Sequence, residues 1–500
     1  DTRQPDTPSC RKERAAPVSR RLVLGPFNRV EGDLEVTLDI ADGRIRSAEV
    51  SSSLFRGFES MLIGKDPLDA LVIVPRICGI CSVAQSAAAA AALADAAGLT
   101  MPRNGRLAQN LIQACENLAD HLTHFYCFFM PDFAREAYAG QSWHPAFSAR
   151  FQALKGSSLA DFLPARAGFL RVMGYLAGKW PHTLALQPGG TTRAITSTER
   201  VRLLTVLREF RQFVEQTVFA DSLENVAALD TPAALDAWAS QRDADFPRFL
   251  AAAQSLGLGR VGRAADRFLS FGAYEEESAT LFPSGLWDAE FKGGQALDAG
   301  RIVEDVSHSW LAGDTPLPPL QGETRPLADG KAGAYTWCKA PRYAGQVVET
   351  GALARQVLSQ HPLALRLVLD HGGSVQARVT ARMLEVARLL PQMEGWLRAI
   401  EPGESFCAQW ESPQQAEGVG LVEAARGSLG HWLRIEHGKI ASYQIIAPTT
   451  WNFSPRDAAG LPGALEQALV GLPVAEGDKN PVLVQHVVRS FDPCMVCTVH

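Results

Sequence analysis

The sequence predicts an α+β fold in which helices dominate, with a large helical-bundle body, small antiparallel β-hairpins and a looped peripheral lobe. Three observations lead to this prediction. Long segments such as 103–130 carry apolar residues at helical spacing. Two segments alternate apolar and polar residues on either side of a tight turn, which is typical of hairpins. The stretch 270–345 is instead rich in Gly, Pro and Asp, which indicates loops.

The individual elements follow from local patterns along the chain. A first hairpin is expected over 32–52, because apolar residues alternate in two runs and Asp42-Gly43 between them supplies the turn. An Ala-rich helix is expected over 82–98, directly after the first cysteine pair, and a longer one over 103–130. Further elements are helices at about 197–229, 233–257, 350–360 and 375–400, and a second hairpin over 431–447 with its turn at His437-Gly438.

Length and composition indicate one large globular protein. The chain has 500 residues, of which 46% are hydrophobic and 20% charged, so it can bury a large core. Residues 1–21 are expected to form a loosely held tail, and 22–500 a single domain. A net charge of −6 gives no reason to expect nucleic acid or an anionic membrane as partner.

No segment of the sequence carries an export or membrane signal. Arg20-Arg21 is followed by only three apolar residues before Gly25-Pro26, too few for the apolar region of a leader. The apolar run 87–93 is too short to span a bilayer. We therefore expect a cytoplasmic protein without a direct membrane span.

Two Cys-x-x-Cys pairs, Cys78/Cys81 and Cys494/Cys497, lie at opposite ends of the chain. Each pair presents two sulfurs to one metal, and together they make a four-thiolate site that forms only once the whole domain has folded. Spacing alone favours zinc or an iron–sulfur centre, and nickel and a redox dithiol also remain open.

The other five cysteines show no cluster spacing. They stand alone in the sequence and are expected to be buried bystanders: Cys10, Cys115, Cys127, Cys338 and Cys407. Without an iron–sulfur spacing among them, the chain offers no relay of its own for electrons.

Seven short segments appear in a fixed order along the chain. They are Arg29-Val30-Glu31-Gly32, Phe55-Arg56-Gly57-Phe58-Glu59, Arg76-Ile77-Cys78-Gly79-Ile80-Cys81, Lys339-Ala340-Pro341-Arg342-Tyr343, Arg426-Gly427-Ser428-Leu429-Gly430-His431-Trp432, Pro448-Thr449-Thr450-Trp451-Asn452, and 492–500. Together they resemble the large subunit of nickel–iron hydrogenases, from about residue 22 to the last residue.

The resemblance implies roles for the four cysteines. Cys78 and Cys494 would be terminal nickel ligands, while Cys81 and Cys497 would bridge nickel to an iron that carries carbon monoxide and cyanide. Thiolate chemistry agrees with a soft metal. The diatomic ligands follow from the resemblance alone.

Five further residues gain roles from the resemblance. Glu31 would relay protons beside a terminal thiolate, although without the resemblance an ion pair with a nearby Arg would be expected. Arg426 would hang over the metals and polarise or deprotonate bound hydrogen. Asp120 and Asp492 would hold this Arg, and Thr449 would hydrogen-bond a cyanide nitrogen.

A second ion site is also implied by the resemblance. Glu59, the backbone carbonyl of Ile445 and His500 would hold magnesium or a similar hard divalent ion. Carboxylate and carbonyl oxygens suit such an ion, whereas imidazole is less typical of magnesium.

Four positions depart from the usual pattern of the family. Gln85 stands where most members have a His that donates to a bridging sulfur; an amide donates too but does not titrate. Ile80 and Phe128 stand where uptake enzymes usually have Val and Leu at the inner end of the gas channel, and ordinary core packing is the alternative interpretation. Ala425 replaces the usual Pro before Arg426, which loosens one wall.

The substitutions at Gln85, Ile80 and Phe128 resemble the regulatory, hydrogen-sensing subgroup. That subgroup is marked by low turnover and oxygen tolerance, with a narrowed channel that hinders dioxygen more than dihydrogen. The sequence stops at His500, which fits either a chain matured by removal of a peptide or a sensor made without one.

The predicted function is heterolytic cleavage of dihydrogen to protons and electrons. Electrons would pass to an iron–sulfur small subunit, expected in a dimer of heterodimers, and a sensor would signal through its partner to a histidine kinase. A respiratory uptake hydrogenase of the related cytoplasmic group is the alternative. A respiratory-complex subunit of the same ancestry is disfavoured, since such relatives lose the metal whereas the four cysteines are present here.

Overall fold

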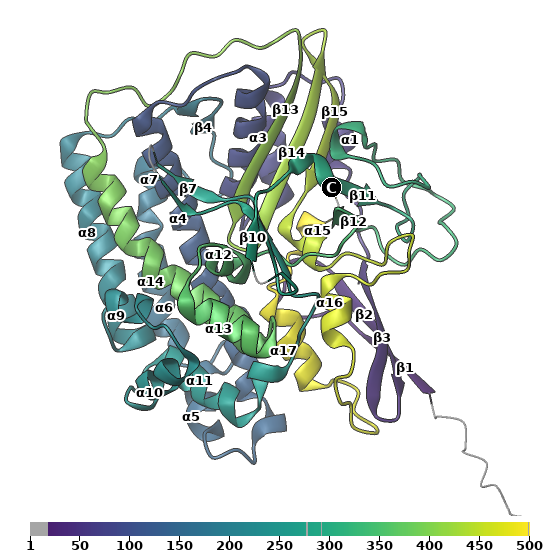
Figure 1. Cartoon of the computed structure of the whole chain (residues 1–500). Coiled ribbons are helices and arrows are strands. Elements are labelled where there is room, and N and C mark those ends of the chain that lie inside the picture. The colour runs from purple at the N-terminus through teal and green to yellow at the C-terminus, as the bar shows by residue number, and fades with distance from the viewer. Residues whose placement is uncertain (1–18, 277–278, 292, 499) are drawn as a thin grey trace, which may run out of the picture.

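The helical body and the small antiparallel sheets pack around one main apolar cluster and a smaller second one, and this architecture confirms the predicted fold class (Figure 1). The computed structural model describes residues 19–276, 279–291, 293–498 and 500. The main buried cluster includes residues from Leu24 to Cys497. Both ends of the described chain therefore contribute to the same core.

Two long helices form the centre of the helical body. α4 (Arg103–Thr123) and α14 (Val375–Ala399) pack against each other and are buried along most of their length. Shorter helices surround them: α5 (His144–Phe151), α6 (Ser158–Phe169), α7 (Arg171–Leu176), α8 (Ser197–Phe213), α9 (Leu223–Ala227), α10 (Pro232–Ser240), α11 (Asp245–Ser255), α12 (Ala352–Leu358) and α13 (Pro362–His371).

Several predicted helices are shorter than expected. The segment 197–229 is interrupted after α8 by a wide helical turn and by Ala220, whose φ of 52° lies in the left-handed region. The segment 233–257 divides into α10 and α11 because Pro247 has no N–H to donate and therefore stands in the first turn of a new helix. Along the segment 103–130, regular α-helix ends at Thr123 and continues as a wider turn to Phe129.

The first predicted hairpin is present and gains a third strand. β2 (Leu34–Ala41) pairs with β3 (Arg44–Ser52), and β1 (Ser19–Leu24) pairs with the other edge of β2. Residues 19–21, which the sequence placed in the tail, thus belong to a strand.

The second predicted hairpin also gains a strand. β14 (Gly427–Glu436) and β15 (Lys439–Ile446) turn at His437-Gly438, both at positive φ, as predicted. The unpredicted strand β13 (Gln415–Ala424) pairs with the other edge of β14.

The remaining strands are short. Most lie in the loop-rich region after α11, as its composition predicted: β4 (Leu186–Gln187), β5 (Gly190–Thr191), β6 (Arg267–Ser270), β7 (Ala273–Glu275), β8 (Thr280–Phe282), β9 (Gly285–Asp288), β10 (Gly293–Gln295), β11 (Ile302–Asp305) and β12 (Ala340–Tyr343).

The Ala-rich helix α3 (Ser82–Ala96) lies directly on strand β13. Close approach depends on two glycines of that strand. A Cβ atom on Gly420 would lie 2.0 Å from the carbonyl oxygen of Ala88, and one on Gly418 would lie 2.1 Å from that of Ala92. Small residues on both elements therefore fix the helix, and with it the cysteine pair at its start, against the sheet.

The last part of the chain returns to this helix start. Helices α15 (Pro448–Asn452), α16 (Ala464–Leu469) and α17 (Val482–Ser490) lead to a final 3₁₀ turn, Met495–Cys497. Two short helices, α1 (Phe58–Leu62) and α2 (Asp69–Ile73), precede the first cysteine pair.

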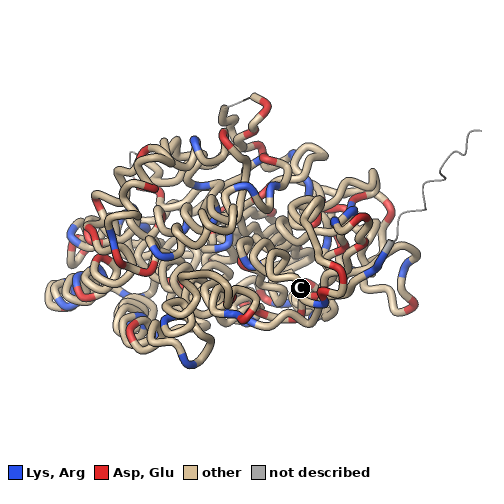
Figure 2. Tube along the Cα trace, turned by 90° about the horizontal axis from the view of Figure 1, so that it is seen from below, with Lys and Arg blue, Asp and Glu red and all other residues tan. Residues whose placement is uncertain are grey.

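Acidic and basic residues are interspersed along the trace (Figure 2). None of the helices in the described segments combines the length and the apolar composition needed to cross a lipid bilayer.

Candidate metal centre

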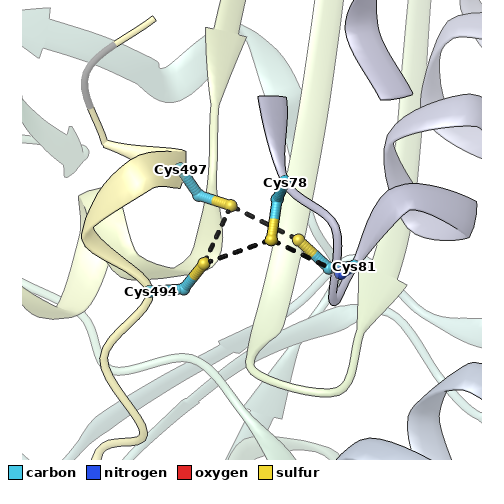
Figure 3. Close-up of side chains that lie close together, drawn as sticks. All are labelled: Cys78, Cys81, Cys494 and Cys497. Atoms are coloured by element: carbon cyan, nitrogen blue, oxygen red, sulfur yellow. Dashed lines mark hydrogen bonds between the residues drawn. The ribbon is translucent and has the colours of Figure 1, made fainter. Parts of the chain in front are cut away.

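The structure brings the four sulfurs of the two Cys-x-x-Cys pairs together (Figure 3). The Sγ atoms of Cys78 and Cys494 are 3.4 Å apart, those of Cys81 and Cys497 3.3 Å, and those of Cys494 and Cys497 3.1 Å. All four side chains are buried, and their sulfurs lie within 4.8 Å of one another. In the described part of the chain, this is the one such group of three or more His, Cys, Asp or Glu ligand atoms.

Local backbone structure aims the first pair of sulfurs. The 3₁₀ turn Val74–Ile77 starts with Pro75 near its beginning and ends at Cys78, which is extended. The backbone N–H groups of Ile80 and Cys81 then donate to the Cys78 Sγ, at 3.3 and 3.5 Å, before α3 starts. These donors favour a thiolate at Cys78.

The four thiols do not ionise independently. Donation from Cys494, and then from Cys497 and Cys81, holds the pKa of Cys78 well below its usual value. Hydrogen bonding within the cluster raises the pKa of Cys81 and Cys494 well above theirs. Four thiolates in one buried space therefore require a cation between them.

Glu31 lies beside the second pair. Its backbone brackets Cys494, because the Met495 N–H donates to the Glu31 carbonyl at 2.7 Å and the Glu31 N–H reaches the Pro493 carbonyl at 3.4 Å. Burial, followed by the charge of Cys78, raises the pKa of this half-buried carboxyl. The nearby Arg29 pairs with Asp132 instead.

Arg426 is buried in a cradle of carboxylates. Its Nη1 donates to Asp120 Oδ2 at 2.5 Å, its Nη2 donates to Asp492 Oδ1 at 2.9 Å, and its Nε donates to the Asp492 carbonyl at 3.0 Å. Although burial opposes the charge, the two carboxylates raise the pKa of Arg426 well above its usual value. The guanidinium is thus a fixed cation, with Cys494 and Cys81 among the charges that act on it.

Thr449 and Gln85 lie beside the second and the first cysteine pair, respectively. The Thr449 hydroxyl accepts the Cys494 N–H at 3.2 Å, which leaves its own hydrogen to donate elsewhere. Gln85 follows Cys81 by one helical turn, and its Oε1 lies 2.9 Å from His431 Nε2. Its Nε2 is buried and has no hydrogen-bond partner in the described segments.

The two proposed channel residues lie at the edge of the core. Ile80 is partly buried and packs against the main apolar cluster. Phe128 is also partly buried and lies on the wider turn after α4. Its carbonyl accepts from Arg29 Nη1 at 2.7 Å, which ties it to the segment that carries Glu31.

The residues expected at the second ion site also converge. His500 Nε2 lies 2.5 Å from the Ile445 carbonyl oxygen and 3.9 Å from Glu59 Oε1. An unexpected cation is present, because Lys339 Nζ lies 3.1 Å from Glu59 Oε1 and 3.2 Å from Glu304 Oε1. Burial lowers the pKa of His500, so its imidazole is available in the neutral form that binds metals.

The donor set fits a soft-metal centre. Four buried sulfurs share one space, and the Gln85 amide and Asp492 Oδ2 nearby retain unused hydrogen-bonding capacity in the described segments. Comparison with known sequences decides which centre this is. The family model described as nickel-dependent hydrogenase matches residues 56–152 and 157–500.

The chain belongs to the nickel-dependent hydrogenase family.

Relatives across the family align with this chain over nearly their whole length. The periplasmic [NiFeSe] hydrogenase large subunit of Desulfomicrobium baculatum is 30% identical, over 96% of this chain and 95% of its own. The hydrogenase-2 large chain of Escherichia coli is 28% identical over 97% of both chains. The uptake hydrogenase large subunit of Cupriavidus necator is 27% identical over 96% and 95%.

Solved structures agree with the sequence comparison. The H2-activated [NiFeSe] hydrogenase of Desulfomicrobium baculatum superposes with a TM-score of 0.84 at 30% identity, over 96% of this chain and 100% of that one. The reduced enzyme of Desulfovibrio vulgaris Hildenborough gives 0.82 at 30% identity, with the same coverage. This chain is thus a large subunit of a nickel-dependent hydrogenase, with hydrogenase activity and a nickel–iron centre.

Several polar residues of this hydrogenase were not singled out from the sequence. Glu116 accepts from the N–H groups of Val83 and Ala84, at 2.9 and 3.0 Å, and so caps the helix that follows Cys81. Lys339 begins the segment Lys339-Ala340-Pro341-Arg342-Tyr343, but nothing in that segment indicates which residues the lysine contacts. Contacts of this kind join residues far apart in the chain, and no local spacing marks them.

The lone cysteines are only partly as expected. Cys115 and Cys338 are buried, whereas Cys127 and Cys407 are partly exposed, and Cys10 lies outside the described residues. Cys127 lies on the wider turn after α4 and Cys407 lies in a loop, where neighbouring residues cover each thiol only in part.

Proposed function

We propose that this chain is the hydrogen-activating large subunit of a regulatory, hydrogen-sensing nickel–iron hydrogenase. The observation that supports this most strongly is the combination of Gln85, Ile80 and Phe128 at positions where catalytic relatives usually carry other residues. The amide nitrogen of Gln85 is buried and unpaired in the described segments, and bulky side chains at Ile80 and Phe128 would restrict the access of dioxygen. We infer a cytoplasmic location, in keeping with a sensor.

The cysteines hold the metals in this proposal. Cys78, Cys81, Cys494 and Cys497 would hold nickel and iron, with Cys78 and Cys494 as ligands of nickel alone, Cys81 and Cys497 shared with the iron, and carbon monoxide and cyanide as further ligands of the iron. The centre supplies Lewis acidity, which makes dihydrogen acidic enough to be split at neutral pH. Thr449, whose hydroxyl accepts the Cys494 N–H, would donate its hydroxyl hydrogen to a cyanide ligand.

Proton handling falls to Glu31 and Arg426. Dihydrogen is split heterolytically, so a base must receive a proton beside the Cys494 sulfur. Glu31 is suited to pass it on, because its backbone brackets Cys494 and burial brings its pKa up toward the working range. Arg426, fixed by Asp120 and Asp492, presents a permanent positive charge that stabilises the developing anion.

The second ion site would hold magnesium or a similar hard divalent ion. Lys339 Nζ contacts both Glu59 and Glu304, and burial raises the pKa of Glu304 to about 7. The Glu59 carboxylate, the Ile445 carbonyl and the neutral imidazole of His500 supply the donor atoms of this site. Carboxylate and carbonyl oxygens favour a small hard cation.

Electrons leave through a partner. Outside the four-sulfur centre, the described part of the chain holds no further cluster of three or more His, Cys, Asp or Glu ligands. In this proposal an iron–sulfur small subunit conducts the electrons, and the complex is a dimer of heterodimers. In the sensor proposed here, the signal passes through the small subunit to a histidine kinase.

A respiratory uptake hydrogenase is the second candidate. It is favoured by the names of relatives such as the uptake hydrogenase of Cupriavidus necator. Turnover separates the two, because rapid hydrogen-dependent dye reduction that collapses in air would reject the sensor.

The metal centre is tested by infrared spectroscopy together with metal analysis of the purified protein. Carbon monoxide and cyanide stretches with one nickel per chain are expected. A lone zinc, or an absence of these stretches, would reject the proposal.

The channel is tested by replacing Ile80→Val together with Phe128→Leu. Hydrogen oxidation by the double variant should become sensitive to air, because smaller side chains widen the passage. Leu163→Val, at an exposed apolar position on α6, serves as the matched control and should leave air tolerance unchanged. Unchanged tolerance in the double variant would reject the channel argument.

A further inference from the structure

Gln85 is held at one end of its amide and free at the other. Its Oε1 lies 2.9 Å from His431 Nε2, whereas the buried Nε2 has no partner in the described part of the chain. A buried amide hydrogen without an acceptor is unfavourable, because it has lost its hydrogen bond to water. Gln85 lies one helical turn after Cys81, on the same face of the chain, so the metal centre is the natural acceptor.

His431 is itself oriented by a third residue. Its Nδ1 lies 2.8 Å from the Tyr443 hydroxyl. The two residues come from neighbouring strands, since His431 on β14 is opposite Ile445 on β15 and Tyr443 stands two positions earlier. Diagonal neighbours of this kind share one face of a sheet, so the contact follows from strand register.

Gly420 brings the helix and the sheet together at this point. It is opposite His431 in the β13–β14 register, and a Cβ there would lie 2.0 Å from the carbonyl oxygen of Ala88 on α3. Only a residue without a side chain allows α3 to approach this closely. Gln85, one turn earlier on the helix, therefore reaches His431.

The donors and acceptors available to Tyr443, His431 and Gln85 determine which atom carries each hydrogen. The Tyr443 hydroxyl has His431 Nδ1 as its only hydrogen-bond partner in the described segments, so donation to that nitrogen satisfies it. A neutral imidazole that accepts at Nδ1 carries its hydrogen on Nε2. That hydrogen requires an acceptor, which must be the Gln85 oxygen.

The opposite arrangement is unfavourable at both ends. It would leave the Tyr443 hydrogen without an acceptor, and it would leave the Gln85 oxygen, in place of its Nε2, without a partner in the described segments.

We propose that Tyr443 and His431 are positioning residues that fix the orientation of the Gln85 amide, so that its Nε2 donates into the metal centre. The relay is a property of this chain's own hydrogen bonds. The group that receives the donation rests on the function proposed above.

The first test follows the tautomer of His431 by 15N NMR of the full chain labelled at histidine and not loaded with metal. The wild-type protein should show hydrogen on Nε2 only. Tyr443→Phe removes the hydroxyl, so both tautomers should become populated. Tyr138→Phe is the matched control, because Tyr138 makes a similar 2.8 Å contact with His486 away from the centre and its loss should leave His431 unchanged.

The second test uses the infrared carbon monoxide band of the loaded heterodimer. Gln85→Glu still accepts from His431 but carries no donor, so the tautomer should persist while the band moves to lower wavenumber. The cause is that a lost donor leaves more electron density on sulfur and on the metal. Tyr443→Phe should move the band in the same direction, and Tyr138→Phe should not move it.

Two results would overturn the inference. One is a His431 that keeps its hydrogen on Nε2 in Tyr443→Phe, and the other is a band that does not move in Gln85→Glu. If Tyr443→Phe does not fold, the band in Gln85→Glu decides. A wild-type protein without carbon monoxide bands would reject the proposed function, and the NMR comparison would then decide the relay by itself.

Discussion

Replacing Arg355→Leu tests whether a buried ion cluster behind the metal centre supports both stability and the position of Arg426. Arg355 is fully buried and binds Glu385 through two hydrogen bonds of 2.8 and 2.9 Å and Glu423 through one of 2.6 Å. It also donates to the carbonyls of Ala424 and Ala425, which directly precede Arg426.

The expected cost follows from what the substitution leaves behind. Two fully buried carboxylates would lose their shared cation, and breaking a buried pair in this way costs about 3–5 kcal/mol. Urea denaturation followed by tryptophan fluorescence should show this loss in the free energy of unfolding. Infrared spectra of the loaded protein should also change, because the strand end before Arg426 loses two donors.

A matched control is available on α14, the helix that carries Glu385. Arg398 is exposed and pairs with Glu394 at 2.9 Å, so Arg398→Leu should change stability by no more than about 0.5 kcal/mol. An equal loss in the free energy of unfolding in the two variants would show that the buried ion cluster contributes no more to stability than a surface ion pair. A destabilised Arg355→Leu protein with an unchanged infrared spectrum would separate stability from the position of Arg426.

Three further predictions concern proton transfer, pH and packing. Glu31→Gln should slow hydrogen turnover by about 10²–10⁴-fold, because the amide cannot pass on a proton. Asp33→Asn, at an exposed position, should leave turnover unchanged. Equal turnover rates in the two variants would contradict a proton-relay role for Glu31. Burial raises the pKa of Glu466 from 4.5 to about 7, so the native state retains a proton between these pH values. The free energy of unfolding should therefore fall by up to about 3 kcal/mol as pH rises through this window. In urea denaturation, Glu466→Gln should remove this pH dependence, and a pH dependence that persists in the variant would have to come from another group. Gly420→Ala should destabilise the fold by about 1–3 kcal/mol in the same assay. Gly395→Ala, in open space on α14, is the control and should be neutral or stabilising by about 0.4–1 kcal/mol. A Gly420→Ala protein of unchanged stability would show that α3 does not require the close contact.

Local patterns predicted much of the fold because they depend on few residues. The hairpin turns at Asp42-Gly43 and His437-Gly438 and the start of α3 after Cys81 are set by neighbouring residues alone. Strand β13 was missed because Gly418 and Gly420 weaken its alternation. Those glycines are required by the helix packed on them, which the sequence of the strand does not show.

The site was predicted in the same uneven way. Motifs marked Cys78, Glu31 and Arg426, since each lies within a recognisable segment. The contacts of Lys339 and His431 come from strand register and from segments far apart in the chain, so local spacing gave no sign of them. Helix ends near Ala220 were missed because a left-handed Ala carries no sequence signal.

The meeting of Cys78 with Cys494 closes a loop of 416 residues. For a flexible chain, bringing such distant points together costs about 5 kcal/mol of entropy, which the metals offset once they bind both ends. A chain released from the ribosome before Cys494 therefore has only half of the ligands and cannot retain the centre. The four-sulfur site can therefore assemble only after the segment that carries Cys494 and Cys497 has been made.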